Sequence, residues 1–234
     1  MIFAMAMGMG VGEGGAAPTT DATAGVRRGL WARAFAWQLS LADGAQHRLY
    51  GARKRRLFAE IEGRAGPPAV VEIGAGTGLN AAYLPPDARW IAVEPNVHFH
   101  DRIRTAAARH GRAVEVVGGT AEALPLADDS ADAVVATLVL CSVADVPAAL
   151  AEARRVLRPG GRLLFVEHVA APEGSILRRA QRLLRGPWTL VAQCRLDQDT
   201  EALVRAAGFA RVEAEPFRVR GGIVAPHVMG VAVA

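Results

Sequence analysis

The segment from Val70 to Gly78 limits the possible folds of this 234-residue chain more than any other part of it. It consists of Val-Val-Glu-Ile followed by Gly-Ala-Gly-Thr-Gly. The first part is typical of a buried strand, and closely spaced glycines let a backbone approach a ligand where a Cβ would collide. A dinucleotide site would require a glycine at position 79, which is leucine here. The pattern predicts a strand and a ligand-binding turn, the simpler alternative being a tight turn without a ligand.

Strand and helix patterns alternate through the rest of the chain. Seven runs are rich in apolar, β-forming residues: 69–73, 90–93, 114–117, 133–136, 162–166, 211–217 and 227–234. Four helical patterns lie between them, at residues 79–84, 99–109, 147–156 and 200–207. Such alternation predicts an α/β fold with a seven-stranded, mostly parallel sheet, right-handed crossovers and helices on both faces.

The N-terminal part has a different character. Residues 1–24 are rich in glycine and small residues, which predicts a disordered tail, with a misassigned start site or a weak membrane-touching segment as alternatives. Apolar residues at helical spacing predict two helices, at about residues 30–41 and 46–61. The expected organisation is a tail over 1–24, helices capping the active site over 25–66, and the main domain over 67–234.

Composition excludes several classes of protein. The net charge of +4 is mild, and its basic residues form no continuous stripe that would indicate a nucleic-acid partner. Cys141 and Cys194 lie far apart without CxxC spacing, which argues against a disulfide framework and against a zinc site, so no metal is expected. This cysteine usage favours a reducing, cytoplasmic setting. No apolar run reaches the roughly 20 residues of a membrane-spanning helix.

The loops that follow the expected strands carry polar residues at informative positions. Glu94 ends the second run about 20 residues after the glycine turn, where a carboxylate can accept hydrogen bonds from two ribose hydroxyls. Taken alone, a glutamate at the end of a strand is more often a solvated surface charge. A third loop, at residues 119–125, reads Gly-Thr-Ala-Glu-Ala-Leu-Pro.

These features together resemble a known family. Glu72 with the G-x-G-x-G turn resembles motif I of the class I S-adenosylmethionine-dependent methyltransferases. More specific stretches are Leu-Val-Leu-Cys-Ser-Val at 138–143, Glu-His-Val-Ala at 167–170 and Pro-His-Val-Met-Gly at 226–230. They look like the thiol methyltransferases of the methyltransferase-like seven group within the type 11 methyltransferases, from about Tyr50 to the C-terminus. Those relatives carry a clear membrane-anchoring segment, of which this chain has at most a feeble counterpart.

The resemblance implies a Rossmann-like class I methyltransferase fold, S-adenosyl-L-methionine as methyl donor and S-adenosyl-L-homocysteine as product. The family pattern carries cofactor-binding roles over to these positions: Glu72, Gly74, Ala75, Gly76, Gly78, Asn80, Glu94, Pro95, Asn96, Thr120, Ala121, Glu122, Thr137, Leu138 and Val139.

The acceptor end is less well marked. His168 follows the fifth run on the ligand side and is the first candidate for a general base, with His227 the second, although either can be structural. A thiol acceptor, with a pKa of about 8.5, needs only a modest base. The expected substrate contacts are Trp31, Tyr50, Cys141, Trp188 and Cys194, with simple packing as the alternative for Cys141. Residues 171–199 are expected to cover the substrate with a basic amphipathic helix, which packs on the domain or lies on a membrane.

The expected activity is therefore methylation of a small lipophilic acceptor, with a thiol sulfur favoured. A quinone carbon, a phospholipid amine and a natural-product hydroxyl are the alternative acceptors. A non-catalytic cofactor-binding or membrane-surface protein is the alternative of another class. A small-molecule partner, no nucleic acid and at most a peripheral membrane contact are expected, and the sequence does not indicate an oligomeric state.

Overall fold

The computed structural model describes residues 28–61, 66–220 and 222–234. The tail predicted over residues 1–24 lies outside them. Two helices begin the described chain, α1 (Leu30–Ser40) and α2 (Asp43–Phe58), close to their predicted positions.

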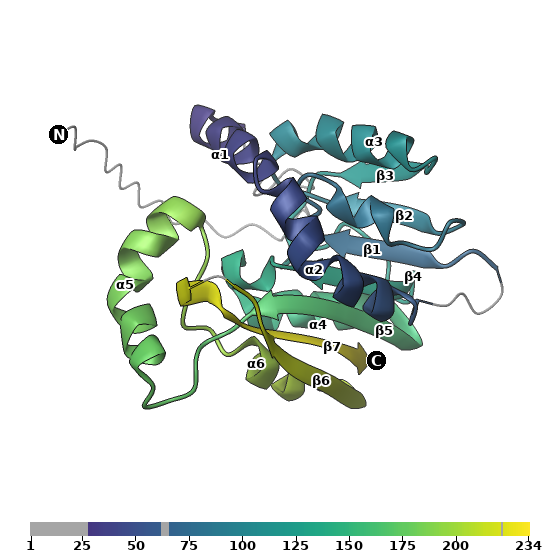
Figure 1. Ribbon diagram of the computed structural model, residues 1–234. Helices are drawn as coiled ribbons and strands as arrows, with labels where there is room; N and C mark the ends of the chain where they lie inside the picture. The colour runs from purple at the N-terminus through teal and green to yellow at the C-terminus, as the bar shows by residue number, and fades with distance from the viewer. Residues whose placement is uncertain (1–27, 62–65, 221) are drawn as a thin grey trace, which may run out of the picture.

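All seven predicted strands are present in one sheet (Figure 1). In chain order they are β1 (Ala69–Ile73), β2 (Arg89–Val93), β3 (Val114–Val117), β4 (Ala131–Thr137), β5 (Leu157–His168), β6 (Arg211–Arg218) and β7 (Pro226–Val233). Their order across the sheet is β3-β2-β1-β4-β5-β7-β6, and β7 runs antiparallel to both β5 and β6. The chain therefore crosses over after β3 and returns next to β1, which brings the ends of β1, β2 and β4 together at one edge.

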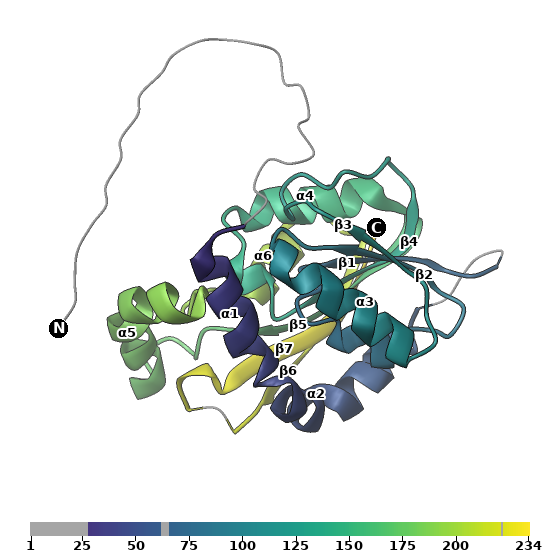
Figure 2. The same cartoon turned by 90° about the horizontal axis from the view of Figure 1, so that it is seen from above.

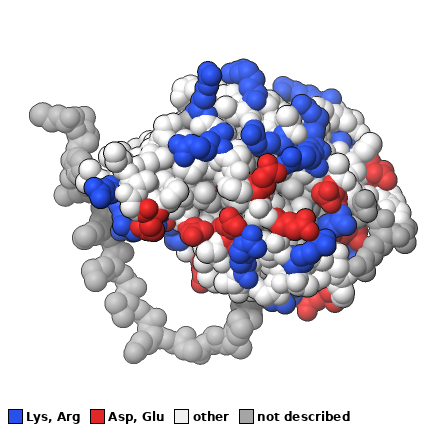
Figure 3. Space-filling model, turned by 60° about the horizontal axis from the view of Figure 1, so that its bottom comes forward, with Lys and Arg blue, Asp and Glu red and all other residues white. Residues whose placement is uncertain are grey.

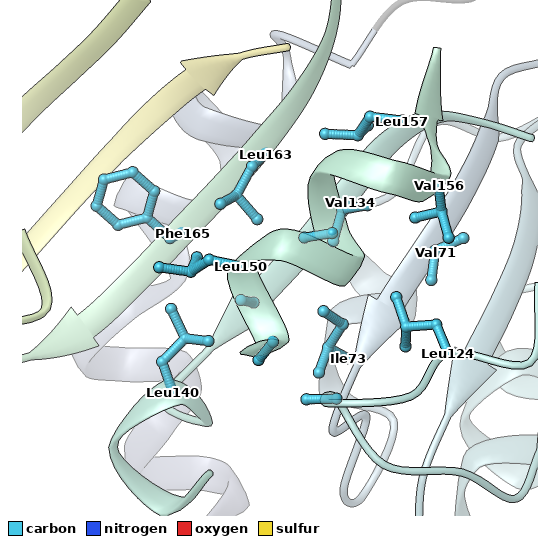
Figure 4. Close-up of a cluster of buried hydrophobic side chains, with 14 of the residues drawn as sticks. Val71, Ile73, Leu124, Val134, Leu140, Leu150, Val156, Leu157, Leu163 and Phe165 are labelled. Atoms are coloured by element: carbon cyan, nitrogen blue, oxygen red, sulfur yellow. The ribbon is translucent and has the colours of Figure 1, made fainter. Parts of the chain in front are cut away.

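One face of the sheet is covered by α4 (Val146–Val156) and α6 (Thr200–Ala206). Figure 4 shows Leu150 of α4 lying among Val134, Leu163 and Phe165 of the strands. Leu150 is 1% exposed, so its replacement by alanine would cost about 2–5 kcal/mol through lost contacts and a cavity.

The opposite face is covered by α1, α2 and α3 (His100–Arg109). Figure 2 shows the sheet between α4 on one side and α2 and α3 on the other. Phe58 of α2 and Ile103 of α3 are fully buried against Trp90 of β2. Because every residue of β1 is buried, this strand shows no polar alternation, as expected for the centre of a parallel sheet.

The prediction of a helix at residues 79–84 is wrong. The chain forms only the 3₁₀ turn η1 (Leu79–Ala82) there. Pro85 and Pro86 follow directly, and a proline disfavours the helical conformation at the residue before it. The remaining connections include the short 3₁₀ turns η2 (Val97–Phe99), η3 (Leu140–Ser142) and η4 (Gly222–Val224).

The long helix α5 (Ile176–Ala192) lies away from the sheet in both views (Figures 1 and 2). Its expected apolar face is not packed on the domain, because Ile176 is 85% and Leu183 is 81% exposed. Gln181 is its one fully buried side chain and binds the backbone of Ala171 and Ile223. Among the described residues, no helix combines the length and the apolar character needed to cross a membrane.

Candidate active site

A cavity of about 700 Å³ opens where the parallel strands β1, β2 and β4 end. In open α/β sheets, ligands bind beyond the carboxyl ends of the strands, where the strand order reverses. This volume lies in the usual range of small-molecule sites. The wall comes from the loops after β1, β2, β3 and β4, from the end of β5, and from α1, α2, α5 and β7.

The glycine turn after β1 forms one wall. Gly74 has φ +63° and lies so close to Val139 that an added Cβ would be 2.3 Å from its Cγ2. Gly78 has φ +79°, and a Cβ there would be 2.9 Å from the Cβ of Ala106 on α3. Gly76 has φ +55° and no neighbour closer than 3.7 Å to such a Cβ. Gly74 and Gly78 thus allow close packing behind the turn. Gly76 presents bare backbone to the cavity, and this surface suits close contact with the cofactor predicted from the sequence.

Glu94 ties the ends of β1 and β2 together. Its side chain is buried, and Oε2 accepts a hydrogen bond of 2.9 Å from the backbone N–H of Gly76. Oε1 accepts a second bond of 2.9 Å from the N–H of Asn96. The carboxylate therefore lies on the cavity wall with a fixed orientation, as the binding of a ribose diol requires.

The loop after β3 forms the next part of the wall. Thr120 and Ala121 line the cavity, and Oε1 of Glu122 accepts hydrogen bonds from the N–H groups of Ala144 and Asp145. Farther along the loop, Glu152 of α4 accepts a bond of 2.8 Å from the N–H of Leu124. The loop of residues 119–125 is thus held in place from the side of α4.

Arg155 of α4 holds the same loop. It donates hydrogen bonds to the carbonyl oxygens of Leu124 and Leu126 and forms ion pairs with Glu152 and Asp128. The hydrogen bond from Arg155 is the main reason why the pKa of Glu152 lies below its ordinary value, and the bond from Leu124 adds to this effect.

A buried polar network supports the wall from behind. Lys54 of α2 donates to Oδ1 of Asn80 at 2.8 Å, and Nδ2 of Asn80 donates to Oε1 of Glu72 at 2.7 Å and to Oγ1 of Thr137 at 2.9 Å. Burial raises the pKa of Glu72 and lowers the pKa of Lys54. These groups join α2, β1 and β4 and position the glycine turn without lining the cavity.

Tyr50 and His227 meet at the far end of the cavity. The Tyr50 hydroxyl lies 2.8 Å from Nε2 of His227, and His227 Nδ1 lies 3.1 Å from the carbonyl oxygen of Ala225. Since a carbonyl can only accept, Nδ1 carries the proton and Nε2 accepts from Tyr50. Burial lowers the pKa of His227 to about 4 and raises the pKa of Tyr50 to about 12, so both groups are neutral over the physiological range.

His168 lies beside both cysteines. Sγ of Cys194 is 3.4 Å from Nε2 and 3.6 Å from Nδ1 of the ring, and Cys141 is buried next to them. Burial alone would lower the pKa of His168, but the Cys141 thiol and the Glu167 carboxylate raise it more. The pKa of the Cys141 thiol is raised by its hydrogen bond to Cys194 and by burial.

The structure brings most of the predicted site residues to this one cavity. Those that line it are Gly74, Gly76, Glu94, Pro95, Thr120, Ala121, Glu122, Leu138, Val139, Tyr50, Cys141, Trp188, Cys194, His168 and His227. Others lie behind the wall: Glu72, Ala75, Gly78, Asn80, Asn96 and Thr137. Asn96, for example, donates its side-chain amide to the carbonyl of Ala32 and holds α1 in place.

Trp31 does not take part in the cavity, although its position predicted a substrate contact. It is 63% exposed, and Phe35 and Leu39 of the same helix line the cavity instead. The helical pattern of α1 carries apolar residues on several sides, so the sequence did not identify the inward face. Gln193 and Val224 also line the cavity and were not among the predicted site residues. Gln193 has φ +52°, a left-handed conformation that its sequence position did not indicate.

Comparisons with known proteins agree with this geometry. Residues 71–165 match the family model described as a methyltransferase domain. The chain is 36% identical over 209 residues to thiol S-methyltransferase TMT1B of Homo sapiens, covering 85% of both chains. It is 30% identical over 210 residues to the ubiquinone/menaquinone biosynthesis C-methyltransferase UbiE of Paracoccus denitrificans, covering 80% of this chain and 82% of that one.

The fold also agrees with a solved structure. A SAM-dependent methyltransferase from Thermotoga maritima, described as a possible histamine N-methyltransferase, matches with a TM-score of 0.63. The match covers 86% of this chain and 96% of that chain at 24% sequence identity, so it bears on the fold alone.

Proposed function

Because this chain belongs to the S-adenosylmethionine-dependent methyltransferases, we propose that it transfers the methyl group to the sulfur of a small lipophilic thiol. The donor carries its methyl group on a positively charged sulfur. The protein therefore mainly has to align the acceptor atom with that methyl group and exclude water.

We propose that the glycine turn, Glu94 and the 119–122 loop bind the donor. Gly74, Gly76, Thr120 and Ala121 line the same part of the cavity, and the Glu94 carboxylate would accept the ribose hydroxyls. The residues behind the wall, Glu72 and Asn80 among them, would act by holding this cradle in place.

The opposite end of the cavity supports a neutral, apolar acceptor. It is lined by Tyr50, Trp188, Cys141, Cys194, His168 and His227, whereas Leu39 lies beside Gly76 and Phe35 beside Phe99, next to the donor wall. Among the described lining residues the carboxylates are Glu94 and Glu122, both in the donor half, and the nearby Glu167 is fully buried behind the wall, so a cationic amine would touch no carboxylate on the cavity surface. This separation, together with the 36% identity to a thiol S-methyltransferase, carries the proposal.

His168 is the group that we expect to meet the acceptor thiol. The lone pair on Nε2 of His227 already accepts a hydrogen bond from Tyr50. His227 would therefore orient the methyl acceptor and would not take a proton from it. Residues 25–66, whose described part contains α1 and α2, would form a cap over the main domain of 67–234, because Phe35, Leu39 and Tyr50 reach into the cavity.

A panel of acceptors tests this function. The purified protein would be incubated with the donor and with alkyl and aryl thiols, quinones, phenols and amines, and the methylated products would be identified by mass spectrometry. We expect methyl thioethers. Methylation of a quinone ring carbon would instead support the second candidate, which the similarity to UbiE favours. Firm binding of S-adenosylhomocysteine without turnover on any acceptor would indicate a non-catalytic cofactor-binding protein.

We also propose a peripheral contact with an anionic lipid surface. Trp37 of α1, Leu41 directly after α1, and Leu183 and Leu190 of α5 are all more than 60% exposed. Both helices also border the cavity, so a lipophilic acceptor could enter from the bilayer surface. α5 carries exposed Arg179, Arg182 and Arg185 beside its apolar side chains, a combination that suits an anionic interface. On the face shown in Figure 3, acidic side chains lie among the basic ones, which suits contact with water.

A further inference from the structure

Two cysteines and a histidine converge at the acceptor end of the cavity. Cys141 comes from the turn η3 after β4, His168 from the last position of β5, and Cys194 from the segment after α5. Their potential ligand atoms all lie within 4.8 Å of one another. The three residues are far apart in the chain and meet only because β4 and β5 are neighbours and the segment after α5 returns to their ends, where the N–H of Arg195 bonds the carbonyl oxygen of Cys141.

The distances fit a tetrahedral metal site. With bonds of roughly 2.3 Å to sulfur and 2.0 to 2.1 Å to nitrogen, the edge between two such ligands is about 3.5 Å. Sγ of Cys194 lies 3.4 Å from Nε2 and 3.6 Å from Nδ1 of His168, so either ring nitrogen has the required separation from this sulfur. Because the ligand atoms of all three residues lie within 4.8 Å of one another, small side-chain rotations would bring Cys141 to an ion held between Cys194 and His168.

The surroundings also suit a metal ion. Cys141 and His168 are buried, and Cys194 is half-buried, so an ion would be largely shielded from solvent. The loop that carries Cys141 is anchored by Glu167, whose Oε1 accepts hydrogen bonds from the N–H groups of Val139 and Leu140. Two thiolates would neutralise a divalent cation, and sulfur with imidazole is a ligand set that zinc prefers.

We propose that Cys141, His168 and Cys194 bind a zinc ion whose fourth coordination position opens into the acceptor half of the cavity. All three residues line the cavity, so the remaining position faces the space for the acceptor. Three protein ligands with one open position are the arrangement of catalytic rather than structural zinc sites. The lack of CxxC spacing in the sequence does not speak against such a site, because its ligands come from separate segments.

The consequence for the reaction rests on the proposed thiol acceptor. With His168 acting as a ligand and no longer as a base, an acceptor thiol would bind the ion through its sulfur as a thiolate, and its proton would pass to water. The sulfur lone pair then forms the new bond to the methyl carbon while the bond from that carbon to the donor sulfonium breaks. The products are a methyl thioether and S-adenosylhomocysteine, and the ion is unchanged.

Metal analysis of the full chain tests the site without reference to activity. After expression with added zinc and removal of loosely bound metal, we expect one zinc per chain. Replacement by Co²⁺ should give the near-ultraviolet thiolate-to-cobalt absorption. Cys141→Ser, Cys194→Ser and His168→Gln should each abolish stoichiometric zinc and this absorption, whereas His110→Gln, at an exposed histidine far from the cluster, should keep both. Unchanged affinity for S-adenosylhomocysteine would verify that the variants fold.

Two results would overturn the proposal. One is that wild-type protein retains no zinc and gives no cobalt–thiolate absorption. The other is that non-reducing peptide mapping finds a Cys141–Cys194 disulfide in place of zinc. Thiol methylation at full rate by zinc-free protein would remove the catalytic role and leave the proposed function intact. Stoichiometric zinc without thiol methylation would support the site and contradict the function. If both the zinc site and the proposed function are correct, removal of zinc lowers the rate of thiol methylation at least about tenfold. The loss is larger at pH values well below the pKa of free thiols.

Discussion

The Tyr50 hydroxyl lies 2.8 Å from Nε2 of His227 and joins α2 to β7, across 177 residues of sequence. Both side chains are buried, and both line the acceptor half of the cavity. The bond therefore fixes the position of the cap helices relative to the sheet at the place where the acceptor would bind.

Tyr50→Phe should destabilise the protein by about 1–3 kcal/mol, because it leaves a buried imidazole nitrogen without its donor. We also expect a higher KM for the acceptor and little change in the affinity for S-adenosylhomocysteine. Thermal unfolding and titration calorimetry measure the two effects. Tyr83→Phe is the matched control, since Tyr83 bonds the exposed His47 outside the cavity. Equal effects of the two variants would contradict this role for Tyr50.

Glu94→Gln should weaken binding of S-adenosylhomocysteine by roughly 10- to 100-fold, the range expected for losing hydrogen bonds to a charged group. An amide cannot accept from Gly76, Asn96 and a ribose diol in the way a carboxylate does. Isothermal titration measures the affinity. Glu115→Gln, on an exposed position of β3, should bind like wild type. Wild-type affinity in Glu94→Gln would show that the ribose lies elsewhere.

Gly74→Ala should destabilise the protein more than Gly111→Ala. Both glycines have φ +63°, so the cost of the left-handed backbone, about 1–2 kcal/mol, is common to the two variants. Only at position 74 would the new Cβ collide with Val139, whereas nothing lies within 4 Å at position 111. Denaturant unfolding compares the two, and cofactor affinity should fall only in Gly74→Ala. Equal costs would mean that the turn can move away from Val139.

The ion pair of Glu152 with Arg155 should make a contribution to stability that depends on pH. The pKa of Glu152 in the folded protein lies below its ordinary value of 4.5, so the contribution is present above that value and is lost as the pH falls through the folded pKa. Wild type should thus be more stable than Glu152→Gln near neutral pH, and the difference should shrink on the acid side. Thermal melts of both proteins across this pH range measure the difference in stability. A difference that does not change with pH would contradict the prediction.

Membrane contact predicts flotation with anionic vesicles. Wild-type protein should rise with vesicles of phosphatidylcholine and phosphatidylserine, and added salt should weaken the arginine part of the attraction. Leu183→Ser with Leu190→Ser should abolish flotation, because these side chains protrude from α5. Leu49→Ser, at a partly exposed position of α2, is the control and should float. Wild-type protein that stays at the bottom of the gradient would refute the contact.

The donor half of the site could be predicted because its signals are local. The glycine turn follows directly on a buried strand, and Glu94 comes at a fixed interval after it, so neighbouring residues carry the information. The strand positions were predictable for the same reason. The helix predicted at residues 79–84 does not form, because Pro85 and Pro86, which lie just beyond the apolar pattern, disfavour the helical conformation before them.

The acceptor half could not be predicted in the same way. Which side of α1 faces inward depends on how the helix docks, and it is Phe35 rather than Trp31 that reaches the cavity. The sequence leaves open whether the apolar side of α5 packs on the domain or lies on a membrane, and in the structure Ile176 and Leu183 of this side are exposed. Cys194 and His168 are 26 residues apart and meet only through the fold, so their spacing carried no recognisable pattern.

Most of the acceptor half of the cavity comes from other stretches of the chain than the donor half, Cys141 being an exception. The donor wall lies within residues 71–165, the part that matches the family model, whereas Phe35, Tyr50, Trp188 and His227 come from segments outside it. Selection or an experimenter can thus exchange α5 and the last hairpin with little effect on the recognition of the methyl donor, whereas an exchange of α2 would have to keep Lys54, which supports the glycine turn through Asn80. Chimaeras that keep 71–165 and borrow the flanks of a relative offer a direct route to new acceptor preferences.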